Sequence, residues 1–222
     1  MSLFPIFLKL TGRHCLVVGA GTVAESKISS LLRAEAKLTV VAPEALPCLA
    51  EQAQAGHFQW QQRNFSPSDL DGIFLVVAAT SSPEVNRQVF QLATERGILC
   101  NAVDDPPNCD FYFPSIVERG ALQIAISTAG ESPALAQRLR REIDAQLAPE
   151  ISAWLNELGK LRREVLQQQE PGEERRLLLH ELARLPLCTL PTCPARQLAC
   201  TGETTQRGNA KHPRKISPSF IS

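Results

Sequence analysis

Short apolar runs alternate with stretches of helical periodicity over the first hundred residues. The runs are rich in β-branched residues, which is typical of strands that are buried on both faces of a sheet. The segments between them repeat apolar residues at helical spacing, and the one that starts at Pro83 follows a capping Ser82 and stops at Gly97. This alternation predicts an α/β fold, a parallel sheet with helices on both faces. The expected buried strands are 14–18, 37–41, 73–79 and 98–103.

The pattern changes after residue 112. Apolar β segments without intervening helices occupy 111–127, and three helical stretches follow, up to Leu185. From Pro186 onward Pro, Thr, Gly and basic residues dominate and the periodicity disappears, so we expect a disordered tail whose removal leaves folding and activity intact. The predicted organisation is an α/β domain over 1–112, a small β/α dimerisation segment over 113–148, a C-terminal helical region over 149–185 and the tail over 186–222.

A glycine turn follows the first strand. Gly19 permits a sharp turn, Gly21 has no Cβ to hold a pyrophosphate away from the main chain, and a helix starting at Thr22 presents unpaired N–H groups to that anion. Glu44 follows the second strand, near where an acid reaches a ribose diol. This order predicts a Rossmann-type domain that binds a dinucleotide. The alternative is an α/β turn without a ligand.

Several candidate site residues follow the strands at one edge of the predicted sheet. Ligands of parallel α/β sheets bind at the carboxyl ends of the strands, where the glycine turn, Glu44, 79–81 and Asp104 should line one crevice. Asp104 is our candidate proton acceptor. The alternative is that Asp104 or Asp105 only caps the turn before the two prolines that follow.

Composition narrows the functional classes. The 222 residues carry 23 Lys+Arg and 23 Asp+Glu, so no overall field favours nucleic acid or an anionic membrane. The apolar N-terminal segment contains Pro5 and Lys9, is too short to span a bilayer and lacks a signal cleavage site, so we expect an edge strand there. Seven cysteines without disulfide-framework spacing favour the cytoplasm. The four histidines lack zinc-ligand spacing, so we expect no resident metal.

Beyond these patterns, specific stretches carry a family resemblance. They are PIFLKLTGRHCLVVGAGTVAESKISSLL, LTVVAPE, FLVVAAT, NAVDD and FYFPSIVERGALQIAISTAGESPALAQRLRREI. In order and spacing they resemble the precorrin-2 dehydrogenase family, the module at the N-terminus of siroheme synthase that also exists as a stand-alone enzyme. TAGESPALA is a far more specific marker than the glycine turn. Because fused siroheme synthases continue into a large methyltransferase module, we expect a stand-alone form that does not make precorrin-2 itself.

The resemblance implies a homodimeric enzyme that oxidises precorrin-2 to sirohydrochlorin with NAD, and in some members inserts ferrous iron to give sirohaem. It implies NAD contacts at Thr22, Val23, Pro43 and Glu44, to which we add Gly19, Gly21 and Thr80. Asp104 matches the aspartate considered essential for dehydrogenation and, in bifunctional members, for chelation. Thr128 falls where some members carry a phosphorylatable serine.

Precorrin-2 is a polycarboxylate, which points to further contacts. Ser127, Thr128, Gly130 and Ser132 form a small polar loop before a helix N-terminus that suits an acetate or propionate arm, and Arg138 offers fork-like carboxylate contacts. The alternatives are simple helix capping by Ser132 and an arginine that only forms a solvated helix face.

Two other functions remain open at this point. One is an NAD-sensing regulatory module without turnover, which would share the glycine turn but has no reason to carry Asp104 beside TAGESPALA. The other is an NADP enzyme, which is disfavoured because no Arg or Lys closely follows Val41 and Glu44 would repel a 2′-phosphate.

Overall fold

The computed structural model describes residues 3–187 and 194–201. The chain divides into two compact units. One holds the residues up to Pro114 together with Ser127–Ala136, and the other holds Ser115–Ile126 and the residues from Gln137 onward. The division therefore runs through the predicted 113–148 segment.

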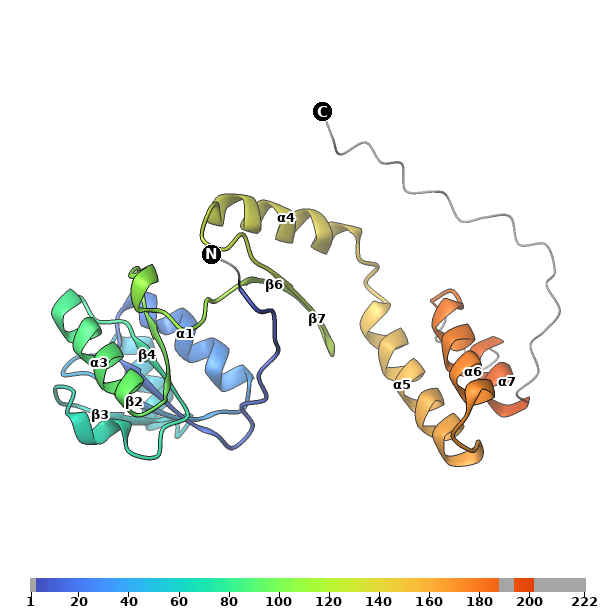
Figure 1. The fold of residues 1–222 in the computed structure, drawn as a ribbon, viewed down its shortest axis with the longest axis horizontal. Helices are drawn as coiled ribbons and strands as arrows, with labels where there is room; N and C mark the ends of the chain where they lie inside the picture. The colour runs from blue at the N-terminus through green and yellow to red at the C-terminus, as the bar shows by residue number, and fades with distance from the viewer. Residues whose placement is uncertain (1–2, 188–193, 202–222) are drawn as a thin grey trace. The chain divides into compact units, whose positions relative to one another are not determined.

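A five-stranded parallel sheet forms the centre of the first unit, in the order β3-β2-β1-β4-β5 (Figure 1). The helices α1 (Thr22–Arg33) and α2 (Pro47–Gln54) pack on one face of the sheet, and α3 (Pro83–Glu95) and the 3₁₀ helix η1 (Pro67–Leu70) pack on the other. The predicted α/β fold with helices on both faces is confirmed. The strands are β1 (His14–Val18), β2 (Lys37–Val41), β3 (Gln59–Gln61), β4 (Leu75–Ala78) and β5 (Leu99–Ala102).

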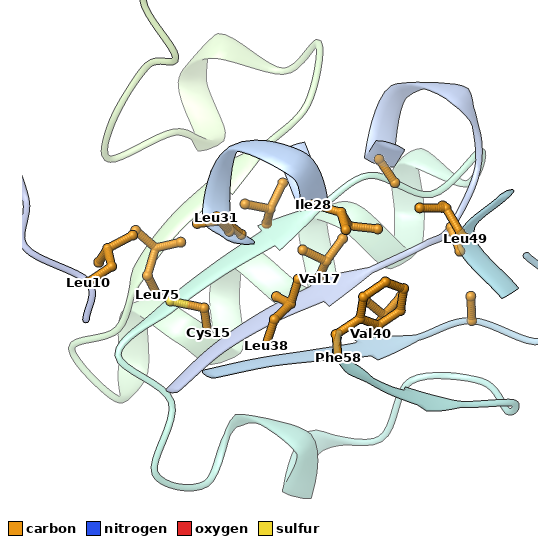
Figure 2. Close-up of a cluster of buried hydrophobic side chains, with 14 residues drawn as sticks. Leu10, Cys15, Val17, Ile28, Leu31, Leu38, Val40, Leu49, Phe58 and Leu75 are labelled. Carbon is orange, nitrogen blue, oxygen red and sulfur yellow. The ribbon is translucent and has the colours of Figure 1, made fainter. Parts of the chain in front are cut away.

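The alternation of side chains along β1 explains why its sequence is continuously apolar. Cys15 and Val17 pack with Ile28 of α1, while Leu16 and Val18 belong to the core on the α3 face. Figure 2 shows the first of these two clusters. Because both faces of β1 are buried, a shift by one residue would move every side chain into the wrong core, and the register is strongly specified.

The N-terminal segment is not a strand, so that prediction is wrong. Residues 3–10 pair with no strand, and the side chains of Phe4 and Phe7 are 85% and 70% exposed. Pro5 lacks an N–H for a strand ladder. The outer edge of β5 is also occupied: Asp110 accepts from Cys100 N–H at 2.9 Å and its own N–H donates to Cys100 O at 2.8 Å.

The second unit contains the antiparallel hairpin β6 (Ser115–Arg119) and β7 (Leu122–Ile126), most of α4 (Pro133–Gln146), and three further helices. These helices are α5 (Ile151–Gln168), α6 (Glu173–Arg184) and α7 (Pro194–Thr201), and they share one core. The helix α7 lies within the stretch predicted to be disordered, and its Ala195 and Leu198 are buried. The structure thus differs from that prediction over 194–201, while 188–193 and 202–222 lie outside the described residues. None of the described helices is long and apolar enough to cross a membrane.

Candidate functional site

The carboxyl ends of three neighbouring strands are level with one another. Val18 pairs with Val41 on one side and with Ala78 on the other. The residues just beyond these ends are tied together by backbone bonds, from Gly19 N–H to Val41 O at 2.9 Å and from Ala79 N–H to Val18 O at 2.8 Å. The glycine turn and the loop after β4 are therefore held side by side.

The two glycines of the turn have different structural roles. Gly19 has φ +106°, and a Cβ there would lie 2.4 Å from Ala79 O, so only glycine fits. Gly21 precedes α1 and has open space where a Cβ would be. No side chain caps the N-terminus of α1, so its first N–H groups remain available for an anion.

A cavity of about 230 Å³ opens beside this turn. It joins the start of α1, the loop after β4 and the end of β5, at the carboxyl edge of the sheet where parallel α/β folds bind ligands. Residues that the sequence singled out therefore meet here, and all but one of the lining residues belong to that set. The cavity is lined by Gly21, Thr22, Val23, Ala79, Thr80, Ser81 and Asp104, and by Val103, which the sequence did not single out.

Asp104 differs from its neighbour Asp105 in what it does. Asp105 accepts a hydrogen bond from Asn108 Nδ2 at 2.7 Å and precedes the 3₁₀ helix η2 (Pro106–Asn108), as a turn residue does. Asp104 has φ +60° and is exposed at the cavity, and none of the described residues hydrogen-bonds to its carboxylate. Asp105 thus occupies the N-cap position of η2, without a side-chain bond to the backbone there, and the Asp104 carboxylate is available for a ligand.

Lys27 is a charged neighbour of Asp104 that the sequence reasoning missed. Its Nζ lies 4.0 Å from the centroid of the Phe113 ring. Burial lowers the pKa of Lys27, and the negative charge of Asp104 acts in the opposite direction. Its position on α1 was a usable signal, because Lys27 follows the cavity residue Val23 by four positions and so shares its helix face.

Other residues predicted for the site lie outside the cavity lining. Pro43 and Glu44 are exposed in the loop after β2, which is fastened to the glycine turn by a bond from Leu46 N–H to Ala20 O at 3.0 Å. Arg138 belongs to the second unit and forms an ion pair with Glu142 on its own helix at 3.3 Å.

The polar loop before α4 is held by its own hydroxyl groups. Thr128 Oγ1 accepts from Ser132 N–H at 3.2 Å, and Ser132 Oγ accepts from Leu135 N–H at 3.3 Å. Ser127 Oγ accepts from Ala129 N–H at 3.1 Å, and Gly130 has φ +88°. Helix capping by Ser132 is therefore present, and hydrogen bonds between its own hydroxyl groups and the main chain define the conformation of the loop.

A larger cavity, of about 680 Å³, lies elsewhere in the first unit. Its lining includes His14 and Lys37, the first residues of β1 and β2, so it is at the amino ends of the strands. It contains no carboxylate and none of the glycine-turn residues. The smaller cavity is therefore the better candidate for the functional site.

Comparison with known proteins adds to this geometry. Residues 6–115 match a family model of NAD(P)-binding domains, and residues 119–146 match the model of the sirohaem biosynthesis protein central domain. The solved structure of SirC, precorrin-2 dehydrogenase, superposes with a TM-score of 0.71 at 27% identity, covering 81% of this chain and 89% of that one. The chain belongs to the siroheme synthase and precorrin-2 dehydrogenase family. The resemblance read from the sequence is confirmed.

Curated members of the family include the siroheme synthase of Photorhabdus laumondii, which is 46% identical over 176 residues, or 79% of this chain and 37% of that protein. Siroheme synthase 3 of Aeromonas hydrophila is 45% identical over 177 residues, which are 79% of this chain and 38% of that protein. The chain thus spans little more than a third of the length of these relatives.

The glycine turn of this family member fits a dinucleotide. A pyrophosphate needs close approach to the main chain, and the open space at the Cβ position of Gly21 and the uncapped N-terminus of α1 provide it. Acidic Glu44 stands beyond the end of β2, in a loop tied to the same turn. These features match the requirements for NAD.

Proposed function

We propose that this chain oxidises precorrin-2 to sirohydrochlorin with NAD in sirohaem biosynthesis. The observation that carries the proposal is the convergence of the glycine turn and Asp104 on one cavity at the carboxyl edge of the sheet. Membership of the family gives the substrate class, since SirC is a precorrin-2 dehydrogenase.

The residues of the chain divide the work between holding the cofactor and moving a proton. The backbone at Gly19, Gly21, Thr22 and Val23 would hold the pyrophosphate, with Pro43 and Glu44 completing the cofactor site and Thr80 forming part of its wall. Bound NAD supplies a hydride acceptor. Asp104 accepts the proton that the macrocycle loses together with the hydride, and passes it to water. The substrate thus loses one hydride and one proton, which amount to two electrons and two hydrogens.

Electrostatics favour this role for Asp104. Its carboxylate accepts no hydrogen bond from the described residues, so a lone pair is available for a substrate proton. The ammonium group of Lys27 is near enough to interact with that carboxylate, whose negative charge acts to raise the pKa of Lys27 against the effect of burial.

We place the carboxylate arms of the substrate at Ser127, Thr128, Gly130 and Ser132, with Arg138 as a further contact. The loop supports this because its hydroxyls and left-handed backbone at Ala129 and Gly130 order main-chain groups before α4. Glu44 favours NAD over NADP because a carboxylate repels a 2′-phosphate.

Ferrous iron is proposed as a second substrate. Chelation requires two pyrrole protons to leave as the ion enters, and Asp104 is the acceptor in reach of the cavity. Across residues 3–187 and 194–200, no three His, Cys, Asp or Glu side chains are grouped to hold a resident ion, so iron would bind through the macrocycle.

A homodimer is also proposed. Phe4, Ile6 and Phe7 are 57% to 85% exposed within one short segment, a concentration of apolar surface that association would bury. Light scattering after size-exclusion chromatography should give twice the chain mass, and Phe4→Ser/Phe7→Ser should reduce it. A wild-type mass of one chain would contradict the dimer.

The cytoplasm is the compartment that the cysteines favour. Cys15 and Cys100 are fully buried free thiols, and burial raises the pKa of Cys15 to about 11 and that of Cys100 to about 12. Such thiols stay protonated and form no disulfide, which suits a reducing environment.

The deciding experiment is an anaerobic assay of precorrin-2 with NAD, following the tetrapyrrole spectrum for the wild type and for Asp104→Ala. We expect sirohydrochlorin from the wild type and at least a roughly 100-fold slower reaction from the variant, with NAD affinity retained. If the wild type binds NAD and the spectrum never changes, the chain is a sensor without turnover. Adding ferrous iron to the completed reaction tests chelation.

A further inference from the structure

Asn86 is a buried amide that faces the loop between β4 and α3. It lies in the first turns of α3, and its side chain is 6% exposed although the residue is polar. Its Oδ1 accepts from Thr80 N–H at 3.1 Å, and its Nδ2 donates to Thr80 O at 3.1 Å. One side chain thus holds both main-chain polar groups of Thr80.

The hydroxyl of Thr80 is committed to the same network. Thr80 Oγ1 lies 2.8 Å from Asn86 Oδ1 and accepts from Ser82 N–H at 3.1 Å. The polar groups of Thr80 are therefore directed into the protein rather than toward a ligand. In this loop Ser81, which is exposed and lines the cavity, has the polar groups best placed to meet one.

The loop that Asn86 holds is a wall of the proposed cofactor site. Ala79, Thr80 and Ser81 line the cavity opposite the start of α1. Ala79 O approaches the glycine turn so closely that a Cβ on Gly19 would lie 2.4 Å away. Fixing Thr80 from behind therefore fixes the separation between the loop and the turn, and with it the width of the site.

We propose that Asn86 is a positioning residue for the dinucleotide: by clamping Thr80 it sets the cavity wall against which the cofactor binds. This rests on the proposed NAD-dependent function. Loss of the amide leaves a Thr80 N–H and C=O without their partner in a part-buried loop, and the loop then relaxes toward or away from the turn. NAD affinity falls, while Asp104 and the precorrin-2 contacts are untouched.

A structural role alone would produce a different result, and Val89 supplies the control. Val89 is fully buried on the same helix, three residues further along, and packs in the sheet-facing core without contacting the loop through hydrogen bonds. Val89→Ala therefore weakens the packing of α3 but leaves the clamp intact.

The test compares Asn86→Ala, Val89→Ala and the wild type as full-length chains. NAD affinity is measured by titration calorimetry, the KM values for NAD and precorrin-2 by steady-state kinetics, and Tm by calorimetry. We expect Asn86→Ala to raise the Kd and KM for NAD roughly tenfold, with the KM for precorrin-2 within about twofold of the wild type. Val89→Ala should lower Tm and leave the Kd for NAD within about twofold.

Two results would overturn the proposal: an unchanged Kd for NAD in Asn86→Ala, or an equal rise in Val89→Ala. Should Asn86→Ala not fold, Asn86→Ser takes its place, since its short hydroxyl keeps the position polar but cannot bond both main-chain groups of Thr80. A rise of roughly threefold in the Kd for NAD then supports the clamp, and no rise refutes it. A wild-type protein that does not bind NAD would instead refute the proposed function itself.

Discussion

Asp104 adopts a backbone conformation that a non-glycine residue enters at a cost. Its φ of +60° lies in the left-handed region, where Cβ crowds the backbone and glycine is favoured by about 1 kcal/mol. Aspartate tolerates this region better than most residues, but not without cost. The proposed role of Asp104 as a proton acceptor would account for a carboxylate at such a position.

Asp104→Gly should therefore stabilise the protein and inactivate it. We expect the free energy of unfolding in urea to rise by about 1 kcal/mol and turnover to fall by roughly 100-fold or more. Glu35 is a matched control, because it has φ +59° and is exposed outside the cavity. Glu35→Gly should be stabilised similarly with unchanged turnover, and a loss of turnover there would argue against a specific role for Asp104.

At Gly19 we expect a substitution to destabilise the protein, because the structure leaves no space for a Cβ there. Gly19→Ala combines a left-handed φ with a Cβ placed 2.4 Å from Ala79 O, and we expect it to lower the free energy of unfolding by about 3 kcal/mol. Gly12 has φ +72° with nothing within 4 Å of a Cβ, so Gly12→Ala should cost about 1 kcal/mol. Equal urea midpoints for the two variants would contradict the close approach.

At the scale of elements, one carboxylate organises the connection from β3 to β4. Asp69 accepts from Arg63 Nη1 and from Ser66 N–H, each at 2.8 Å, and its side chain is only 6% exposed. It lies in η1, which places the fully buried Leu70 in the core. The Arg63 guanidinium holds the pKa of Asp69 below its ordinary value.

This pair predicts a pH-dependent contribution to stability. Since the folded-state pKa of Asp69 is lowered, the contribution is complete above the ordinary value of about 3.9 and is lost as the pH falls through the lower folded-state value. Asp69→Asn should cost about 1 kcal/mol at pH 7 in urea unfolding, and the cost should shrink as the pH falls below the ordinary pKa of the carboxyl. The exposed Asp71→Asn is the control, and a penalty for Asp69→Asn that does not change as the pH falls would contradict the assignment.

At the scale of the whole molecule, the two units have separate cores. The core of the second unit includes Trp154 and Leu161 of α5 and Leu198 of α7, and Glu157 of α5 pairs with Arg196 of α7. The helix α7 therefore completes a core that α5 and α6 share.

Truncation after Pro186 should affect the two units differently, in contrast to the silent deletion expected from sequence. Without α7, the apolar residues of α5 are uncovered, so hydrogen exchange of α5 and α6 amides should accelerate at least roughly tenfold. Exchange in β1 and β4 and the affinity for NAD should not change. Unaltered protection of α5 would mean that α7 contributes no stability.

The sequence predicts those parts of the protein in which the local pattern of apolar residues agrees with the packing in the tertiary structure. The run from His14 to Val18 reads as a strand because both of its faces are buried, and the glycine turn follows from the backbone it requires. The short α7 has a single large apolar side chain, Leu198, and the core that it shares with distant α5 holds it. The apolar pattern near Phe7 does not make a strand, because Pro5 lacks an N–H for a ladder and the outer edge of β5 is occupied by Asp110.

The residues in and around the cavity likewise separate into those that the sequence predicts and those that it does not. Its position at the carboxyl edge and its residues Gly21 and Asp104 follow from strand order alone. Asn86 does not, because its partner Thr80 becomes known only after α3 has packed, and an asparagine on a helix is usually taken for a surface residue. For Lys27 the helical spacing from Val23 indicates the helix face, but its contact with the Phe113 ring is known only from the structure.

The segment that runs back beside β5, with Asp110 bonded to Cys100, has a consequence for the behaviour of the protein at high concentration. Exposed edge strands recruit strands from other molecules and seed aggregation. The main-chain and side-chain bonds from Asp110 occupy the N–H and C=O of Cys100 at the outer edge of β5, and at the other edge β3 is only three residues long. We therefore expect that weakening the segment that follows Asp104 would expose this edge and favour aggregation.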